Sequence, residues 1–152
     1  MYNRCTDAAG VRQEVLRLVN ERFITREQAD AVDCGKIAAF FATPFGAKLI
    51  AAKNVVREFK FSIMEDAGSI SEELKGEKIL LQGVVDCAII EDDGITIVDF
   101  KTDRVTNETL LAVAKGYTQQ VAAYSDAMQR IYQLPIKAKA LYFFQLNEFV
   151  WL

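Results

Sequence analysis

Apolar residues recur with helical spacing in the first third of the chain. Val11, Val15, Leu16, Leu18 and Val19 follow a period of roughly 3.6 residues and predict an amphipathic helix that ends near Phe23. Three shorter helices are predicted to follow: one after the capping pair Thr25 and Gln28, one at residues 34–42, and one that starts at Thr43-Pro44 and runs to about Asn54. These segments are typical of a packed helical layer.

From Val55 onward the pattern changes to the alternation of β-strands. Val55, Phe59, Phe61 and Ile63 are predicted to share one face of a strand at 55–64, with Glu58 on the other face. The remaining predicted elements are a polar loop at 65–77, strands at 78–90 and 94–102, a short helix at 107–115, a longer helix at 116–132, a strand at 137–146, a turn at Asn147-Glu148 and a last strand at 149–152.

This order of elements predicts a mixed α/β fold in one domain. A chain of 152 residues with 51% hydrophobic content is long enough to bury a substantial core. We expect a central mixed sheet, a helical layer formed by the N-terminal segments, and a helix between the third and fourth strands. The domain then divides into a helical part at residues 1–54 and a strand-rich core at residues 55–152.

Composition excludes several functional classes. The chain has no apolar run long enough to span a membrane and no signal-peptide pattern, so we expect a soluble cytoplasmic protein without a membrane partner. Cys5, Cys34 and Cys87 are far apart and lack CxxC spacing, which predicts free thiols in a reducing compartment. The absence of histidine excludes Ser-His and Cys-His catalysis within the chain and any His-ligated zinc site. A net charge of −3 argues mildly against a free-standing nucleic-acid binder.

Three charged side chains interrupt the apolar hairpin formed by the second and third strands. Asp99 and Lys101 are two residues apart, so they point to the same face of their strand. Asp86 lies on the preceding strand. A two-residue loop at Asp92-Asp93 would set it opposite Asp99, and a loop at Asp93-Gly94, the favoured turn pair, would set it opposite Lys101. Either register predicts all three side chains on one face.

This arrangement indicates a bound cation. Two carboxylates and an ammonium group on an apolar face would be costly to bury without a ligand, and they suit a hard divalent cation with a lysine beside it. On the later helix, Gln120 and Tyr124 are four residues apart and therefore lie on one face. The purely structural alternatives are a surface ion-pair cluster on the hairpin, a half-buried tyrosine beside a solvated glutamine, and, for Glu58, a solvated charge at a sheet edge.

The ordered set of motifs resembles the PD-(D/E)xK nuclease superfamily, and within it the RecB-like branch. That branch shows GxxD, then D-Y/F-K-T/S, then QxxxY; here these are Gly83–Asp86, Asp99–Thr102 and Gln120–Tyr124. The chain looks most like the C-terminal nuclease domains of AddA-type helicase–nucleases, a likeness that includes the strands at 57–61 and 141–144. The resemblance covers about residues 20–152 and implies a restriction-endonuclease-like core.

The resemblance also implies catalytic roles. In such a nuclease, Asp86, Asp99 and the main-chain carbonyl of Phe100 would bind Mg²⁺ or Mn²⁺. Lys101 would orient or help to deprotonate the attacking water and stabilise the charge that develops on the phosphate.

Supporting roles follow from the same resemblance. Gln120 and Tyr124 would position the DNA backbone or support the metal ligands. Thr102 would support the turn or contact a phosphate, and Glu58 resembles the strand glutamate of the family. The implied activity is metal-dependent exonuclease cleavage of single-stranded DNA during double-strand-break repair. The implied partners are DNA, the helicase domains of a bacterial parent chain and an AddB-type subunit.

The chain departs from the family pattern in two ways. RecB-like nucleases carry a histidine metal ligand on an N-terminal helix, and this chain contains no histidine. It also lacks a P-loop, so it has no helicase motor of its own. Both departures are expected of a fragment of a longer helicase–nuclease, which would bind metal weakly or be inactive by itself.

Two alternatives stay open at the level of the sequence. One is a nuclease-fold module that binds or scaffolds DNA ends without catalysis, which the missing histidine supports. The other is a free-standing PD-(D/E)xK nuclease of restriction type, which the absence of a basic arm or readout motif disfavours.

Overall fold

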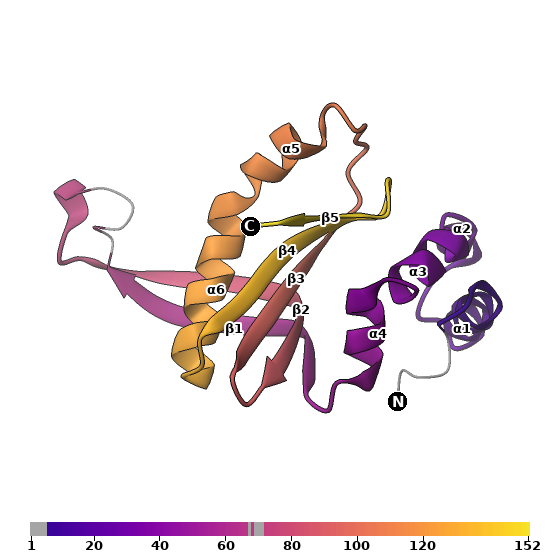
Figure 1. Ribbon diagram of the computed structural model, residues 1–152, viewed down its shortest axis with the longest axis horizontal. Helices are drawn as coiled ribbons and strands as arrows, with labels where there is room; N and C mark the ends of the chain where they lie inside the picture. The colour runs from indigo at the N-terminus through magenta and orange to yellow at the C-terminus, as the bar shows by residue number, and fades with distance from the viewer. Residues whose placement is uncertain (1–5, 67, 69–71) are drawn as a thin grey trace.

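A computed structural model describes residues 6–66, 68 and 72–152 of the chain. The strands in this range are β1 (Val55–Asp66), β2 (Lys78–Glu91), β3 (Gly94–Lys101), β4 (Ile136–Phe143) and β5 (Glu148–Trp151). They form one sheet in the order β1-β2-β3-β4-β5 (Figure 1). β3 and β4 run parallel and the other neighbours run antiparallel, so the predicted mixed sheet is confirmed.

Helices precede the sheet and connect β3 to β4. They are α1 (Ala8–Asn20), α2 (Arg26–Asp30), α3 (Cys34–Phe41), α4 (Pro44–Ala51), α5 (Leu110–Gly116) and α6 (Thr118–Tyr132), with a 3₁₀ turn, η2 (Glu72–Leu74), between β1 and β2. Thr25 and Gln28 form the predicted capping box of α2, and Thr43 caps α4 with Pro44 at its first position. Both predicted helix starts are therefore confirmed, whereas α1 ends before the predicted Phe23.

The two faces of the sheet are covered by different helices (Figure 1). Helix α6 packs on one face, where its buried residues Tyr124, Ala127 and Met128 meet β1, β2 and β3. Phe40 of α3 and Phe45 and Leu49 of α4 pack on the other face against β2, β3 and β4. Residues of both faces are buried in the centre of the sheet, which gives the continuous apolar character of β2 and β3.

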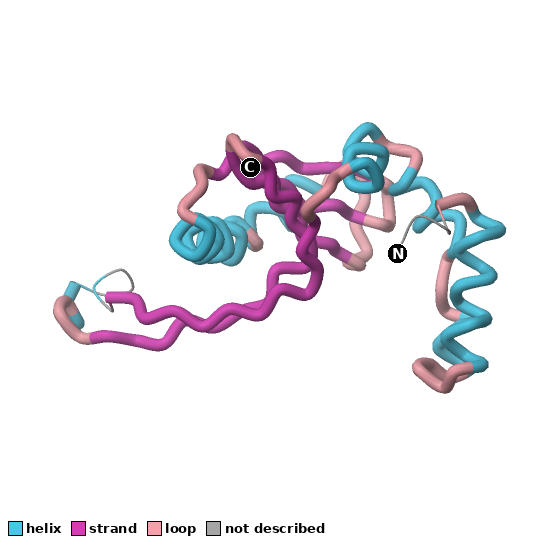
Figure 2. The backbone as a smooth tube through the Cα atoms, turned by 90° about the horizontal axis from the view of Figure 1, so that it is seen from below, coloured by secondary structure: helices cyan, strands magenta, loops and turns pink. Residues whose placement is uncertain are grey.

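The outer halves of β1 and β2 form a two-stranded ribbon that extends beyond the other strands (Figure 2). Val55 packs with the α3–α4 side, whereas Phe59 and Ile63 pack on the α6 side. The prediction that these residues share one face is therefore wrong. The change of face occurs at Glu58, whose φ of 48° interrupts the regular strand alternation. The ribbon is thus turned at the level of Glu58.

The hairpin between β2 and β3 adopts one of the two predicted registers. Glu91 pairs with Gly94, so the two-residue loop is Asp92-Asp93. The favoured Asp-Gly turn is not used because Gly94 serves another purpose. A Cβ atom at Gly94 would lie 2.6 Å from the Pro135 carbonyl oxygen, so the glycine lets the chain pass close to the start of β4.

The C-terminal hairpin is shorter than predicted. β4 ends at Phe143 instead of continuing to residue 146, and the turn occupies residues 144–147 instead of Asn147-Glu148. Asn147 has a φ of 56°, a backbone conformation that asparagine tolerates better than most residues and that closes the turn. Earlier in the chain, the predicted loop at 65–77 starts later because β1 continues to Asp66, and residues 67 and 69–71 lie outside the described residues.

Two further features bear on the composition. Cys34 and Cys87 are free thiols, and burial raises the pKa of Cys87 to about 11, whereas Cys5 lies outside the described residues. In the described part of the chain no single helix is long and apolar enough to cross a membrane; α3 and α4 reach that length and apolar character only as a pair bent by 76°. The predicted boundary between residues 54 and 55 falls between α4 and β1.

Candidate active site

The hydrogen-bonded ladder between β2 and β3 stops next to the candidate carboxylates. The last regular pair is Cys87 with Val98, and the same register sets Asp86 opposite Asp99. In place of a ladder bond, the Asp86 carboxylate accepts a hydrogen bond from the Phe100 N–H, with 2.8 Å between Oδ2 and N. Since the N–H and C=O of a strand residue point to the same side, the Phe100 carbonyl also faces β2. Asp86, Asp99 and this carbonyl therefore meet at one end of the hairpin.

Asp99 is a buried carboxylate with a single cationic partner. Its residue is 2% exposed, and its Oδ2 atom lies 2.6 Å from Lys101 Nζ. Within the described residues this oxygen has no well-directed hydrogen bond. Burial raises the pKa of Asp99, and Lys101 partly offsets that rise. Because a buried ionised carboxylate is stable only beside positive charge, the position favours a bound cation.

A line of contacts connects Asp99 to helix α6. Lys101 Nζ donates a hydrogen bond to Gln120 Oε1 at 2.9 Å, and Gln120 Nε2 donates to the Tyr124 hydroxyl at 2.7 Å. Burial raises the pKa of Tyr124, and the hydrogen bond from Gln120 opposes that rise. The two helix residues thus lie on one face as predicted, and they contact Lys101 directly instead of forming a tyrosine–glutamine pair that is merely solvated.

Gly83 allows Tyr124 to approach the sheet. A Cβ atom at this position would lie 2.7 Å from Phe61 Cζ and 3.0 Å from Tyr124 Cε1. The two rings meet edge to face directly over the glycine, with centroids 5.8 Å apart. The glycine of the Gly83–Asp86 motif is therefore needed for packing, three residues before the carboxylate itself.

Asp86 differs from the expectation that all three charges stand on one face. Asp99 and Lys101 share the α6 side, but Asp86 lines a cleft on the α3 side. Strand β2 changes face at this residue, because Val85 packs on the α6 side and Cys87 on the other. Asp86 therefore lies at the seam between the two faces, where it can be approached from either.

Glu58 lies across the sheet from Asp86. The register of β1 and β2 is the same before and after this point, so residues 58 and 86 oppose each other without a regular pair. Both line the cleft, of about 480 Å³, which opens between α1, α3 and the sheet. Glu58 is exposed and has positive φ, a conformation that costs a non-glycine residue energy and that recurs at functional sites.

Comparison with known proteins agrees with this geometry. The family model of the PD-(D/E)XK nuclease superfamily matches residues 3–150. The chain belongs to the PD-(D/E)XK nuclease superfamily. The predicted resemblance and the predicted mixed α/β fold are thereby confirmed.

The relatives of this superfamily member are parts of much longer enzymes. The AddA-type subunit of the ATP-dependent helicase/nuclease from Bacillus mycoides (strain KBAB4) is 37% identical over 150 residues, which cover 92% of this chain and 12% of that protein. The corresponding proteins from Bacillus cereus (strain ATCC 10987 / NRS 248) and Bacillus cytotoxicus (strain DSM 22905 / CIP 110041 / 391-98 / NVH 391-98) are 37% and 35% identical over the same share. The chain therefore spans about 12% of the length of these relatives.

The donor chemistry fits a divalent cation of the kind that PD-(D/E)XK nucleases generally use. Asp86, Asp99 and the Phe100 carbonyl offer only hard oxygen ligands, and the Asp99 Oδ2 atom is buried without a directed hydrogen bond. In the described residues, no group of three or more His, Cys, Asp or Glu side chains is placed to hold a metal ion. The nuclease motif thus supplies two carboxylates and a carbonyl, and Lys101 provides the positive charge beside Asp99.

Two residues of the site were missed by the sequence analysis. The Tyr117 ring lies under Lys101, with Nζ 3.7 Å from the ring centroid, and its hydroxyl donates a hydrogen bond to Asp103 Oδ1 at 2.9 Å. The available signal was spacing, since Tyr117 precedes Gln120 by three residues and Asp103 follows Lys101 by two. Thr102, by contrast, is exposed directly after the end of β3.

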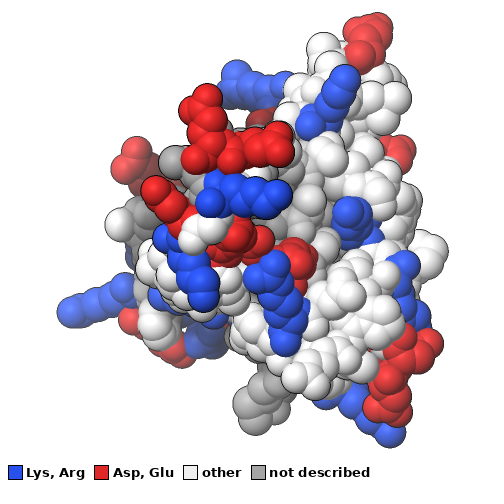
Figure 3. Space-filling view, turned by 90° about the vertical axis from the view of Figure 1, so that its left-hand side faces the viewer, with Lys and Arg blue, Asp and Glu red and all other residues white. Residues whose placement is uncertain are grey.

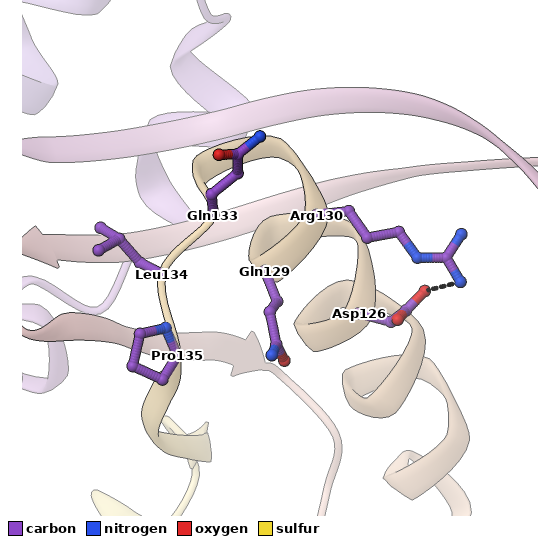
Figure 4. A pocket seen from close by; sticks show the side chains of 6 residues that line it. All are labelled: Asp126, Gln129, Arg130, Gln133, Leu134 and Pro135. Atoms are coloured by element: carbon purple, nitrogen blue, oxygen red, sulfur yellow. Dashed lines mark ion pairs between the residues drawn. The ribbon is translucent and has the colours of Figure 1, made fainter.

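A second hollow lies at the C-terminal end of α6, away from Gln120 and Tyr124 (Figure 4). Its main charged group, Arg130, pairs with Asp126 at 2.9 Å and with Glu65 of β1 at 2.8 Å. These contacts tie α6 to the ribbon, so the hollow has a structural explanation and the nuclease chemistry is better placed at the Asp99 site.

Proposed function

We propose that this chain is the metal-dependent deoxyribonuclease domain of an AddAB-type helicase–nuclease, and that it hydrolyses phosphodiester bonds of single-stranded DNA. The observation that carries the proposal is the connected cluster of Asp99, Lys101, Gln120 and Tyr124 beside Asp86 in a chain of the PD-(D/E)XK superfamily. Its charged and polar groups come from two strands and one helix, which holds them in fixed relative positions.

Each residue has a role that its surroundings support. Asp86, Asp99 and the Phe100 carbonyl would hold Mg²⁺ or Mn²⁺, which supplies Lewis acidity and a template for in-line attack on phosphorus. Lys101 would hold the attacking water at Nζ and counter the negative charge that develops on the phosphate.

The remaining residues would act around this centre. Gln120 and Tyr124 would fix Lys101 and the DNA backbone from the α6 side. Glu58, from the cleft side, would assist Asp86, and Thr102 would contact a phosphate where the chain leaves β3.

The biological setting is proposed from the relatives. The helicase domains of a longer parent chain would unwind duplex DNA, and an AddB-type subunit would complete the complex. We place this activity in the bacterial cytoplasm, in double-strand-break repair by recombination.

One observation favours a second candidate function. The described residues contain no group of three metal-binding side chains, and the sequence has no histidine. A nuclease-fold module that binds DNA ends without cutting them would need no complete metal site.

Metal binding and cleavage distinguish the two candidates. Calorimetric titration of this chain with Mn²⁺ should show binding that is lost in Asp86→Asn and retained in Asp92→Asn. Asp92 is an exposed aspartate in the turn of the same hairpin and serves as a matched charge control.

Cleavage is then measured on labelled single-stranded DNA with the full-length helicase–nuclease. Asp99→Ala and Lys101→Ala should abolish the metal-dependent cleavage and leave unwinding intact. Cleavage at the normal rate by either variant would refute the nuclease assignment, and DNA binding without cleavage by the unaltered protein would favour the scaffold.

A further inference from the structure

Lys101 is held by three groups from three parts of the fold. Its Nζ atom lies 2.6 Å from Asp99 Oδ2 on β3, 2.9 Å from Gln120 Oε1 on α6 and 3.7 Å from the centroid of the Tyr117 ring, which sits at the junction of α5 and α6. The lysine side chain is only 11% exposed, so few positions remain open to it.

These three contacts would not persist equally during the proposed reaction. A cation held by Asp99 competes with Lys101 for the same carboxylate, because both are positive and both need its oxygen atoms. The neutral contacts with Gln120 and Tyr117 are unaffected by that competition. Of these two, the ring presents a broad face that attracts an ammonium group, and the attraction is strongest where water is excluded.

We propose that Tyr117 is a positioning residue whose ring keeps Lys101 Nζ in place when Asp99 turns to a metal ion. Its catalytic consequence rests on the proposed nuclease function. The placement of the lysine does not.

Asp103 fixes the ring in this position. The Tyr117 hydroxyl donates a hydrogen bond to Asp103 Oδ1 at 2.9 Å, and Asp103 follows Lys101 by two residues along the chain. The segment that leaves β3 is therefore closed back onto the lysine through one tyrosine. A purely structural role for Tyr117 would need only this tie and its packing against the cluster of Val105, Ala114 and Val121.

The two roles are separated by conservative variants. Tyr117→Phe keeps the ring under Lys101 and removes the hydrogen bond to Asp103. Tyr117→Leu removes the ring as well. Tyr132→Leu is the matched control, because Tyr132 lies at the far end of α6 and packs against Phe59, away from Lys101.

The first readout is the proton NMR spectrum of the lysine side chains in this chain. A ring under the ammonium group shifts the adjacent methylene protons upfield, so we expect a shifted Lys101 signal that Lys101→Arg assigns by its disappearance. Tyr117→Leu should abolish the upfield shift, whereas Tyr117→Phe and Tyr132→Leu should retain it. An unchanged Lys101 signal in Tyr117→Leu would overturn the inference whether or not the chain cuts DNA.

The second readout is cleavage by the full-length enzyme. Tyr117→Leu should lower the rate constant by roughly five- to thirtyfold, the factor that corresponds to a desolvated cation–π contact. Mn²⁺ affinity should stay the same, because the metal ligands are untouched, and Tyr117→Phe should restore most of the rate. If the enzyme cuts DNA and Tyr117→Leu cuts equally fast, the positioning role fails alone. If the unaltered enzyme does not cut, the proposed function fails, and the NMR signal still decides where Lys101 lies.

Discussion

The chemistry of the site is concentrated in the contact between Asp99 and Lys101. Asp99 is deep in the sheet and its pKa is raised by burial, yet the cation that pairs with it is a single lysine two residues away. A single ion pair rarely repays the cost of burying a carboxylate. The residue is thus better suited to binding a cation than to stabilising the fold.

The raised pKa of Asp99 predicts a pH dependence of stability. An acid whose pKa is higher in the folded state binds more protons when folded, so its contribution to stability grows as the pH falls from the folded pKa toward the unfolded value of about 3.9. Asp99→Asn removes this contribution. In metal-free buffer, urea unfolding between pH 7 and pH 4 should show that the wild type gains stability relative to the variant as the pH falls. Parallel pH profiles would contradict the burial effect.

Glu58 indicates that function and stability are opposed on β1. Its φ of 48° is strained for any residue with a side chain, so Glu58→Gly should raise the free energy of unfolding by about 0.5–1 kcal/mol. The same change should weaken metal-dependent cleavage if Glu58 assists Asp86. Lys60→Gly, an exposed position two residues further along the strand, should instead lower stability. A loss of stability in Glu58→Gly would show that the conformation is not strained.

At the level of elements, local patterns predicted more than pairing did. The capping residues Thr25 and Thr43 determine nearby helix starts, so their effect is readable from the sequence. Strand alternation on β1 failed at Glu58, because one residue with positive φ reverses every later side chain. The register of the β2–β3 hairpin was also undecided, since it depends on how closely Gly94 approaches Pro135, a residue far along the chain.

The same limit explains which parts of the site were found. Asp86, Asp99 and Lys101 stand out as charges in apolar strands, so they were recognised as candidates. Tyr117 looks like an ordinary partly buried aromatic residue in the sequence. Its position under Lys101 arises only when α5 and α6 fold back over β3.

The close packing of α6 on β2 predicts a marked effect of a very small substitution. Gly83→Ala places a methyl group within 2.7–3.0 Å of the Phe61 and Tyr124 rings. It should lower the free energy of unfolding by about 1–3 kcal/mol, the usual cost of overpacking, and separate Tyr124 from Gln120. Gly116→Ala is the control, because its added methyl group meets no atom within 4 Å. Urea unfolding of both variants measures the difference, and equal stability would mean that Tyr124 can move without cost.

At the scale of the whole molecule, charge and length point to a domain that works with others. The net charge is −3, and acidic and basic side chains lie side by side over the end of the molecule that faces the viewer in Figure 3. The relatives are far longer than this chain, which spans 12% of their length. A nuclease that relied on its own surface to hold DNA would be expected to carry a broad positive field.

The charge distribution predicts weak binding of single-stranded DNA by this chain alone. Affinity for a single strand falls with salt with a logarithmic slope of about −0.7 for each phosphate neutralised, so contact with only two or three phosphates gives a slope no steeper than about −2. Fluorescence anisotropy of a labelled oligonucleotide between 50 and 200 mM salt, a range of about fourfold, measures this slope. The full-length helicase–nuclease serves as the comparison and should show tighter binding and a steeper slope, because its motor domains would supply most of the backbone contacts. An equally steep slope for this chain would mean that the domain holds DNA by itself, and the division of labour between motor and nuclease would have to be abandoned.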